Sequence, residues 1–98
     1  MVNNNIKVGI VGISFGMEFI PIYLKHPDVY EIAIADTNPE LIKIAQEKFG
    51  INSKDCYDSY DEMLRDDEID AIHIVTPPST HADFSVKALR AGKHCGCT

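Results

Sequence analysis

One glycine, placed directly after a short apolar run, constrains the fold of this 98-residue chain more than any other feature. Residues 6–11 read Ile-Lys-Val-Gly-Ile-Val, which is typical of a strand buried on both faces of a parallel sheet. Gly12 follows at once and opens the segment Gly12-Ile13-Ser14-Phe15-Gly16. A strand, a glycine turn and a helix in this order direct backbone N–H groups at a bound phosphate. The order therefore predicts a phosphate-binding turn at residues 12–16.

The rest of the chain alternates short apolar runs with helical patterns. Strands are predicted at residues 32–35 and 71–75, with a weak one at 55–57 and the start of another at 93–97. Such alternation is typical of βαβ units on a parallel sheet. The length allows one small domain, residues 1–98. We therefore expect the α/β class, with a parallel sheet of about five strands and flanking helices.

Two of the predicted helices carry clear start and stop signals. Thr37, followed by Asn-Pro-Glu, is the expected N-cap of a helix that ends at Gly50 and turns Leu41, Ala45 and Phe49 inward. A second capping pattern, Ser59-x-x-Glu62, starts a shorter helix.

The first and last helices are also predicted from the sequence. Thr80-x-x-Asp83 is expected to cap the last helix, which should end at Gly92 and bury a stripe formed by Ala82, Val86 and Leu89. The first helix should run over residues 15–26, and Pro21 should bend it or delay its start.

The glycine turn departs from the usual G-x-G-x-x-G pattern of dinucleotide-binding turns. Gly12 matches the first glycine, whereas Ser14 and Met17 stand at the second and third positions. The Ser14 hydroxyl offers a hydrogen bond in place of close backbone approach, and Gly16 is expected to take over close packing of the helix on the strand. From these residues alone, an ordinary tight turn remains an alternative.

Asp36 is the second candidate binding residue. It ends the second predicted strand, 24 residues after Gly12, near the ~20-residue spacing of the carboxylate that binds the adenosine ribose of NAD. A carboxylate there repels the 2′-phosphate of NADP, and no Lys or Arg follows within five residues. The sequence therefore favours NAD over NADP, although a loop or capping role for Asp36 remains open.

Thr76-Pro77-Pro78-Ser79 follows the strand predicted at residues 71–75. In a doubly wound sheet this strand lies beside the first one, and ligands bind in the crevice between the two. The two prolines would offer a stiff, apolar wall without N–H donors. A simple turn is the alternative.

Several segments together resemble one family. Residues 7–12, His26-Pro27-Asp28-Val29, Ala35-Asp36, Thr76 to Ala82 and Ala91 to His94 have the order and spacing of the glucose–fructose oxidoreductase / inositol dehydrogenase (Gfo/Idh/MocA) family, over essentially the whole chain. The resemblance implies a Rossmann-type NAD(P)-binding domain of an oxidoreductase that acts on sugars, polyols or related hydroxy compounds.

The resemblance also implies roles for particular residues. The segment Gly12, Ile13, Ser14, Phe15, Gly16 and Met17 would face the pyrophosphate. Asp36, with Thr37 beside it, would contact the adenosine ribose. The cofactor cleft would be lined by Thr76, Pro77, Pro78 and His81.

The family's catalytic residues have no counterpart in these 98 residues. Thr98 stands where the family has the Glu of a Glu-Lys-Pro motif, so we expect a shortened chain without the substrate domain and without catalytic residues. The small-molecule substrate would need that second domain. His73, between Ile72 and Ile74, is expected to be a core residue with one satisfied nitrogen. A stand-alone dinucleotide-binding or redox-sensing module is the first alternative, and an adenosylmethionine-binding fold is a weaker one.

Composition limits the remaining functions. The net charge is −6 and the nine Lys and Arg are dispersed, so no basic stripe for nucleic acid is expected. No apolar run approaches the ~20 residues of a membrane span and no secretory leader is evident, which favours the cytoplasm. Cys95 and Cys97 beside His94 are too few and too close for a zinc site, so no metal is expected. An exposed edge of the sheet would favour self-association.

Overall fold

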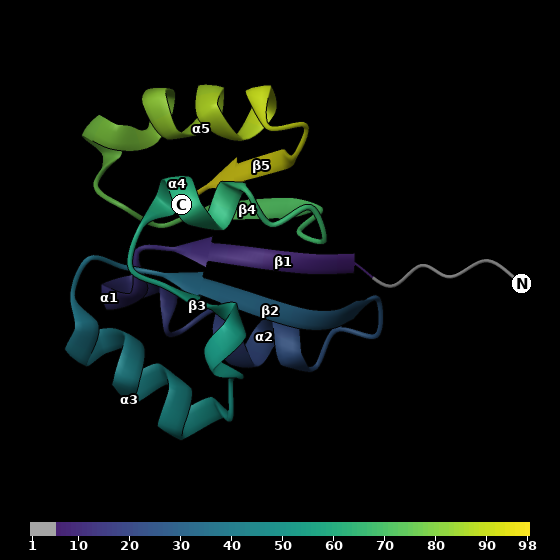
Figure 1. Cartoon of the computed structure of the whole chain (residues 1–98), viewed down its shortest axis with the longest axis vertical. Helices are drawn as coiled ribbons and strands as arrows, with labels where there is room; N and C mark the ends of the chain where they lie inside the picture. Colours follow the sequence, from purple (N-terminus) through teal and green to yellow (C-terminus); the bar gives the residue numbers. More distant parts are fainter. Residues whose placement is uncertain (1–5) are drawn as a thin grey trace, which may run out of the picture.

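The computed structural model describes residues 6–98 and confirms the predicted parallel sheet. The strand arrows point the same way (Figure 1). The strands are β1 (Ile6–Val11), β2 (Val29–Ala35), β3 (Cys56–Tyr57), β4 (Ala71–Ile74) and β5 (His94–Cys97), in the spatial order β3-β2-β1-β4-β5. Because β1 lies between β2 and β4, the chain reverses its direction of winding beside β1. The carboxyl ends of all five strands therefore meet at one edge of the sheet.

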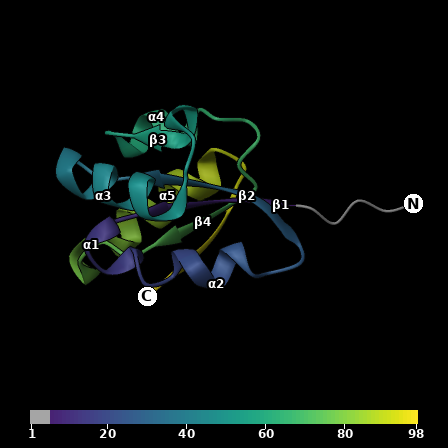
Figure 2. The same cartoon turned by 90° about the horizontal axis from the view of Figure 1, so that it is seen from below.

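Helices cover both faces of this sheet. They are α1 (Ile13–Gly16), α2 (Ile20–Leu24), α3 (Pro39–Phe49), α4 (Tyr60–Leu64) and α5 (His81–Arg90), with short 3-10 turns at Ser53–Asp55 and Pro78–Thr80. One core cluster joins the sheet to α1, α2 and α3, and a second joins it to α4 and α5. Figure 2 shows α2 on one side of the strands and α4 on the other. Successive side chains of β1 point to opposite faces of the sheet, so Ile10 belongs to the first cluster and Val11 to the second.

The break expected in the first helix is confirmed. Instead of one helix over residues 15–26, the chain forms α1 and α2, and Pro21 lies in the first turn of α2. A proline there lacks an N–H that would have no partner in the first turn, so it starts a helix at little cost.

The predicted cap of α3 is wrong by one residue. The N-cap is Asn38, whose side chain accepts a hydrogen bond from the Glu40 N–H at 3.0 Å, whereas Thr37 lies one residue before it. Asn is as good a cap as Thr, and the position of Pro39 at the start of the helix suits Asn38. The other end is as predicted, because Gly50 closes α3 with a φ of 69°. Ser59 caps α4 as expected.

Two predictions for α5 are also wrong. Thr80 makes no side-chain capping bond, because its hydroxyl donates to the Pro77 carbonyl within the preceding 3-10 turn. The predicted inward stripe faces solvent, with Val86 44% and Leu89 62% exposed. The inward face instead carries Ala88 and Phe84. Helix α5 has apolar residues on two sides. The side that packs against the sheet is the one on which Phe84 stacks on Tyr60.

A buried charge cluster forms at the amino ends of the strands, and nothing in the sequence pattern indicated it. Lys7 in β1 is 1% exposed, and its Nζ lies 2.6 Å from Asp55 Oδ1, 3.0 Å from Asp66 Oδ2 and 3.2 Å from Glu31 Oε1. Burial alone would lower the pKa of Lys7, but these carboxylates raise it well above its usual value. Lys7 is therefore a charged residue that joins β1 to the segments around β2 and β3.

The edge of β5 that faces away from β4 pairs with no other strand within residues 6–98. The expectation of self-association is based on such an exposed edge. Self-association itself stays a prediction.

Removing the buried ammonium should destabilise the fold. We expect Lys7→Met to lower the free energy of unfolding by about 3–5 kcal/mol, because the buried Asp55 would lose its closest and only buried counter-charge among residues 6–98 and keep only the exposed Lys54. Lys54→Met is the matched control, since Lys54 contacts the same Asp55 and Glu31 but is 56% exposed. Urea unfolding of both variants checks this, and equal losses would contradict a special role for Lys7.

The cluster should also give an acid-sensitive step. Although burial opposes it, hydrogen bonds from the Glu68 N–H, Lys7 and Tyr57 lower the pKa of Asp66 below its usual value. The stability that this contributes is present above the unfolded pKa of about 3.9 and is lost as the pH falls through the lower folded pKa. We expect Asp66→Asn to flatten the fall in unfolding free energy below about pH 4. Asp67→Asn, at an exposed neighbour, should leave the fall unchanged.

Candidate functional site

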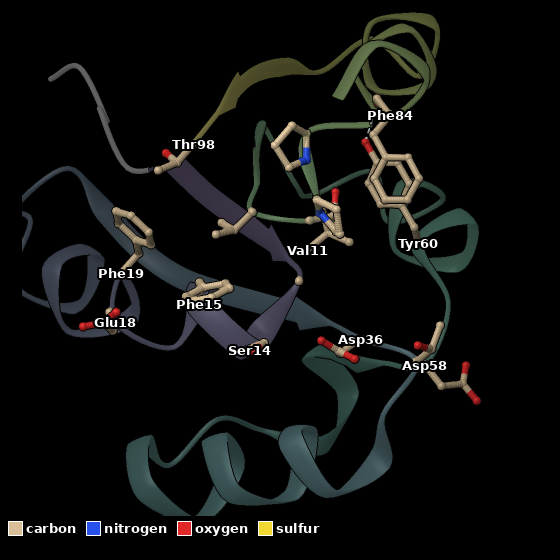
Figure 3. A pocket seen from close by; sticks show the side chains of 16 residues that line it. Val11, Ser14, Phe15, Glu18, Phe19, Asp36, Asp58, Tyr60, Phe84 and Thr98 are labelled. Atoms are coloured by element: carbon tan, nitrogen blue, oxygen red, sulfur yellow. Dashed lines mark hydrogen bonds between the residues drawn. The ribbon is translucent and has the colours of Figure 1, made fainter. Parts of the chain in front are cut away.

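A cavity of about 810 Å³ opens at the carboxyl edge of the sheet, where the chain reverses its winding. Segments that follow β1, β2, β3 and β4 all contribute to its walls (Figure 3). In open α/β sheets this edge is where ligands bind, because loops from neighbouring strands diverge there and leave a crevice. The predicted site residues that line the cavity are Gly12, Ser14, Phe15, Asp36, Thr37, Thr76, Pro77 and Pro78.

Gly12 is required by geometry at the floor of this cavity. Its φ is 92°, a left-handed conformation that L side chains rarely adopt. A Cβ atom there would lie 2.8 Å from the carbonyl carbon of Val75 and 2.9 Å from the Thr76 nitrogen. The glycine turn after β1 therefore packs directly on the backbone that follows β4.

Gly16 performs the close-packing role that the sequence assigned to it. A Cβ on Gly16 would lie 2.9 Å from Cγ2 of Ile10, a side chain with no exposure. The absence of a side chain thus lets α1 sit against β1 although Met17 replaces the third glycine of the usual pattern. Met17 itself packs against the core cluster of α1, α2 and α3.

The turn presents unused hydrogen-bond donors. The Gly12 N–H donates to the Ala35 carbonyl, and the Gly16 N–H donates to the Gly12 carbonyl. Within residues 6–98 the N–H groups of Ser14 and Phe15 have no acceptor, as expected at the start of a helix. Both residues line the cavity, so these donors are available to an anion that enters it.

Asp36 links the glycine turn to the end of β2. Its Oδ2 accepts from the Ile13 N–H at 2.7 Å, and its Oδ1 accepts from the Asn38 N–H at 2.8 Å. Each carboxylate oxygen can accept two hydrogen bonds, so both keep capacity for ligand hydroxyls. The carboxylate therefore orders two loops and still presents acceptors to the cavity.

The segment after β4 is held by its own side chains. The Thr76 and Thr80 hydroxyls contact each other, and Nε2 of His81 lies 2.9 Å from the Thr76 carbonyl oxygen. His81 thus contacts the loop and does not line the cavity. Pro77 and Pro78 do line it, and since proline has no N–H they give the apolar wall that the sequence predicted.

Four predicted binding residues do not line the cavity: Ile13, Gly16, Met17 and His81. Ile13 contributes its backbone N–H to Asp36, and its side chain is fully buried. The assignment of all twelve residues to a cofactor stays a prediction, and eight of them share the cavity.

The cavity also contains residues that the sequence analysis did not identify. They are Val11, Glu18, Phe19, Asp58, Tyr60, Val75, Phe84 and Thr98. Figure 3 shows Phe19 and Thr98 toward one end, Tyr60 and Phe84 toward the other, and Phe15 and Ser14 between them. The one available signal was position, because Asp58 and Tyr60 follow β3 just as Asp36 follows β2.

The charge of the lining is entirely negative. Glu18, Asp36 and Asp58 line the cavity, and no Lys or Arg does so within the described residues. The only donors facing an anion are therefore backbone N–H groups and hydroxyls.

His73 has more partners than predicted. Its Nδ1 lies 2.8 Å from the Tyr23 hydroxyl, and its Nε2 lies 2.7 Å from the Thr98 hydroxyl, so both nitrogens are satisfied where one was expected. The side chain is half-buried and packs edge-on against Phe19. Burial lowers the pKa of His73, which favours the neutral ring in this position.

Metal-ligating clusters and membrane-spanning helices are both absent from residues 6–98. No cluster of three or more His, Cys, Asp or Glu side chains suited to a metal ion occurs among them. None of their helices has the length and apolar character needed to cross a bilayer. The cytoplasmic location stays a prediction.

Comparisons with known proteins agree with this geometry. An uncharacterized oxidoreductase of Rhizobium meliloti is 35% identical over 94 residues, covering 94% of this chain and 28% of its own length. The solved scyllo-inositol dehydrogenase of Lactobacillus casei with bound NAD(H) and scyllo-inositol superposes with a TM-score of 0.82 at 28% identity, covering 95% of this chain and 27% of that one.

A neighbour with the other cofactor is equally similar. A 3-ketoreductase of Actinomadura kijaniata in complex with TDP-benzene and NADP gives a TM-score of 0.83 at 29% identity, covering 95% of this chain and 29% of its own. The chain thus spans between a quarter and a third of the length of these relatives. The neighbours include both NAD(H) and NADP complexes, so they leave the choice of cofactor open.

A family model for oxidoreductases with an NAD-binding Rossmann fold matches residues 6–97. The match covers nearly the whole chain, including the glycine turn, Asp36 and the Thr76-Pro77-Pro78 segment. The chain therefore belongs to the Gfo/Idh/MocA oxidoreductase family, as its NAD-binding Rossmann domain.

Proposed function

We propose that these residues bind NAD(H) as the cofactor-binding part of an oxidoreductase that acts on a sugar, a polyol or a related hydroxy compound. One observation carries the proposal: the free N–H groups of Ser14 and Phe15 and the carboxylate of Asp36 share one cavity at the carboxyl edge of the sheet. A pyrophosphate needs such donors and an adenosine ribose needs such an acceptor.

The charges of the cavity support NAD over NADP. A 2′-phosphate beside the ribose would lie close to Asp36, and Asp58 adds a second carboxylate to the same wall. No cationic side chain lines the cavity within residues 6–98 to offset that repulsion. Coulomb repulsion between close charges is costly in a partly buried site. The charges of this site therefore resemble those of NAD-binding turns.

The nicotinamide would supply the hydride chemistry, and this chain would bind and orient the cofactor. The turn holds the pyrophosphate through backbone N–H groups, and Asp36 fixes the adenosine ribose. The remainder of the cavity, toward Phe19 and Thr98, would then receive the nicotinamide half (Figure 3). The substrate would be bound by regions corresponding to the rest of the relatives' length, consistent with the UDP-GlcNAcA and scyllo-inositol that two of the dehydrogenase neighbours hold.

Calorimetric titration of this chain tests the proposal. We expect saturable 1:1 binding of NADH, weaker binding of NADPH and no displacement of NADH by adenosylmethionine at equal concentration. Competition by adenosylmethionine at equal concentration would favour the alternative nucleotide-binding fold. Absence of NADH binding by the folded chain would refute the proposed function.

Asp36→Asn should change cofactor preference more than stability. The amide oxygen keeps one of the two backbone hydrogen bonds that Asp36 accepts, while the negative charge is lost. We expect the wild-type chain to bind NADH at least about tenfold more tightly than NADPH, and the variant to lose most of that ratio. Asp28→Asn, at an exposed residue outside the cavity, is the control and should keep it. An unchanged ratio in Asp36→Asn would remove the ribose role.

A further inference from the structure

One side of the cavity carries a pair of stacked aromatic rings. Tyr60 at the start of α4 and Phe84 in α5 have ring centroids 4.4 Å apart and ring planes 16° from parallel. Both line the cavity, and both are half-buried. Figure 3 shows the two rings overlaid at the side of the cavity away from Phe19 and Thr98. Both residues therefore form part of the cavity wall.

The pair is held rigidly. The Tyr60 hydroxyl donates to the Phe84 carbonyl oxygen at 2.8 Å, which links α4 to α5. Burial raises the pKa of Tyr60, so its hydroxyl stays protonated and keeps this bond at neutral pH. On the side of the core, the rings pack against the cluster that contains Met63 and Ala88. A ring fixed in this way binds a flat ligand without first losing side-chain freedom.

We propose that the Tyr60–Phe84 pair is the platform on which the purine ring of the cofactor stacks. This inference rests on the proposed function, because that function sets the direction of the ligand. With the pyrophosphate at Ser14 and Phe15 and the ribose at Asp36, the adenine continues toward Tyr60 (Figure 3). Pro77 and Pro78 add apolar surface to the same cavity.

The chemistry of this end fits a purine better than the other parts of the dinucleotide. A purine is flat and has a polarizable π-face, and stacking on an aromatic side chain is favourable for every base. The pyrophosphate and the riboses need charged or hydroxyl partners, which the two rings do not supply because the Tyr60 hydroxyl already donates to the Phe84 carbonyl oxygen. The adenine would thus be bound by side chains of α4 and α5, two helices on the opposite face of the sheet from α1.

Binding measurements on ring variants test the affinity that the platform supplies. We expect Tyr60→Leu, which keeps an apolar side chain but removes the ring, to weaken NADH binding about tenfold. Tyr60→Phe keeps the ring and loses only the hydroxyl, so it should stay within about threefold of the wild type. Tyr30→Leu is the matched control, because Tyr30 is 50% exposed, lies outside the cavity and should have no effect.

Proton NMR of the 98-residue chain with AMP and with NADH tests for direct contact between the adenine and the two rings. Such contact would not be seen if the rings had only a structural role. We expect nuclear Overhauser contacts between the adenine H2 or H8 protons and the ring protons of Tyr60 or Phe84. Saturable NADH binding without such contacts, or with an unchanged affinity in Tyr60→Leu, would overturn the platform and leave the proposed function standing. Absence of NADH binding by the wild-type chain would refute both.

Discussion

The close approach of two backbones underlies the whole site. The turn after β1 lies against the segment that follows β4, with room for a hydrogen atom but not for a methyl group at Gly12. This contact is possible because β1 is central in the sheet and pairs with both β2 and β4. It sets the floor of the cavity, the direction of the Ser14 and Phe15 N–H groups and the position of Pro77 and Pro78. A side chain at Gly12 would separate these parts, so fold and site share one constraint.

Asp36 shows how a residue that is proposed to bind the cofactor can also be structural. Its carboxylate joins the glycine turn to the start of α3 through two backbone N–H groups. The same oxygens keep lone pairs for a ribose, so binding does not require the loops to separate. The site is therefore ordered before the cofactor arrives, which lowers the entropic cost of binding. At the opposite edge of the sheet, Lys7 and its carboxylates provide a second point of order far from the cavity.

Local sequence patterns predicted some elements well and others poorly. The strands, the break at Pro21 and the end of α3 at Gly50 were predicted correctly, because each depends on the conformational limits of one residue or on a short apolar run. The inward face of α5 was predicted wrongly, because its apolar residues occupy more than one side and only contact with the sheet and Tyr60 selects Phe84 and Ala88. The cap at Asn38 was missed because neighbouring Thr37 is also a capping residue and begins a Thr-x-x-Glu capping-box pattern, although Asn is the stronger N-cap.

The sequence by itself determined the class of fold, the order of its elements and the glycine turn and Asp36, since these follow from periodicity, glycine and proline limits and spacing along the chain. It could not determine which distant residues meet. The stacked rings of Tyr60 and Phe84, the burial of Lys7 among carboxylates and the unpaired N–H groups beside Asp36 depend on contacts between segments far apart in the sequence. Those contacts are set by how the helices settle on the two faces of the sheet, and only the tertiary structure decided that arrangement.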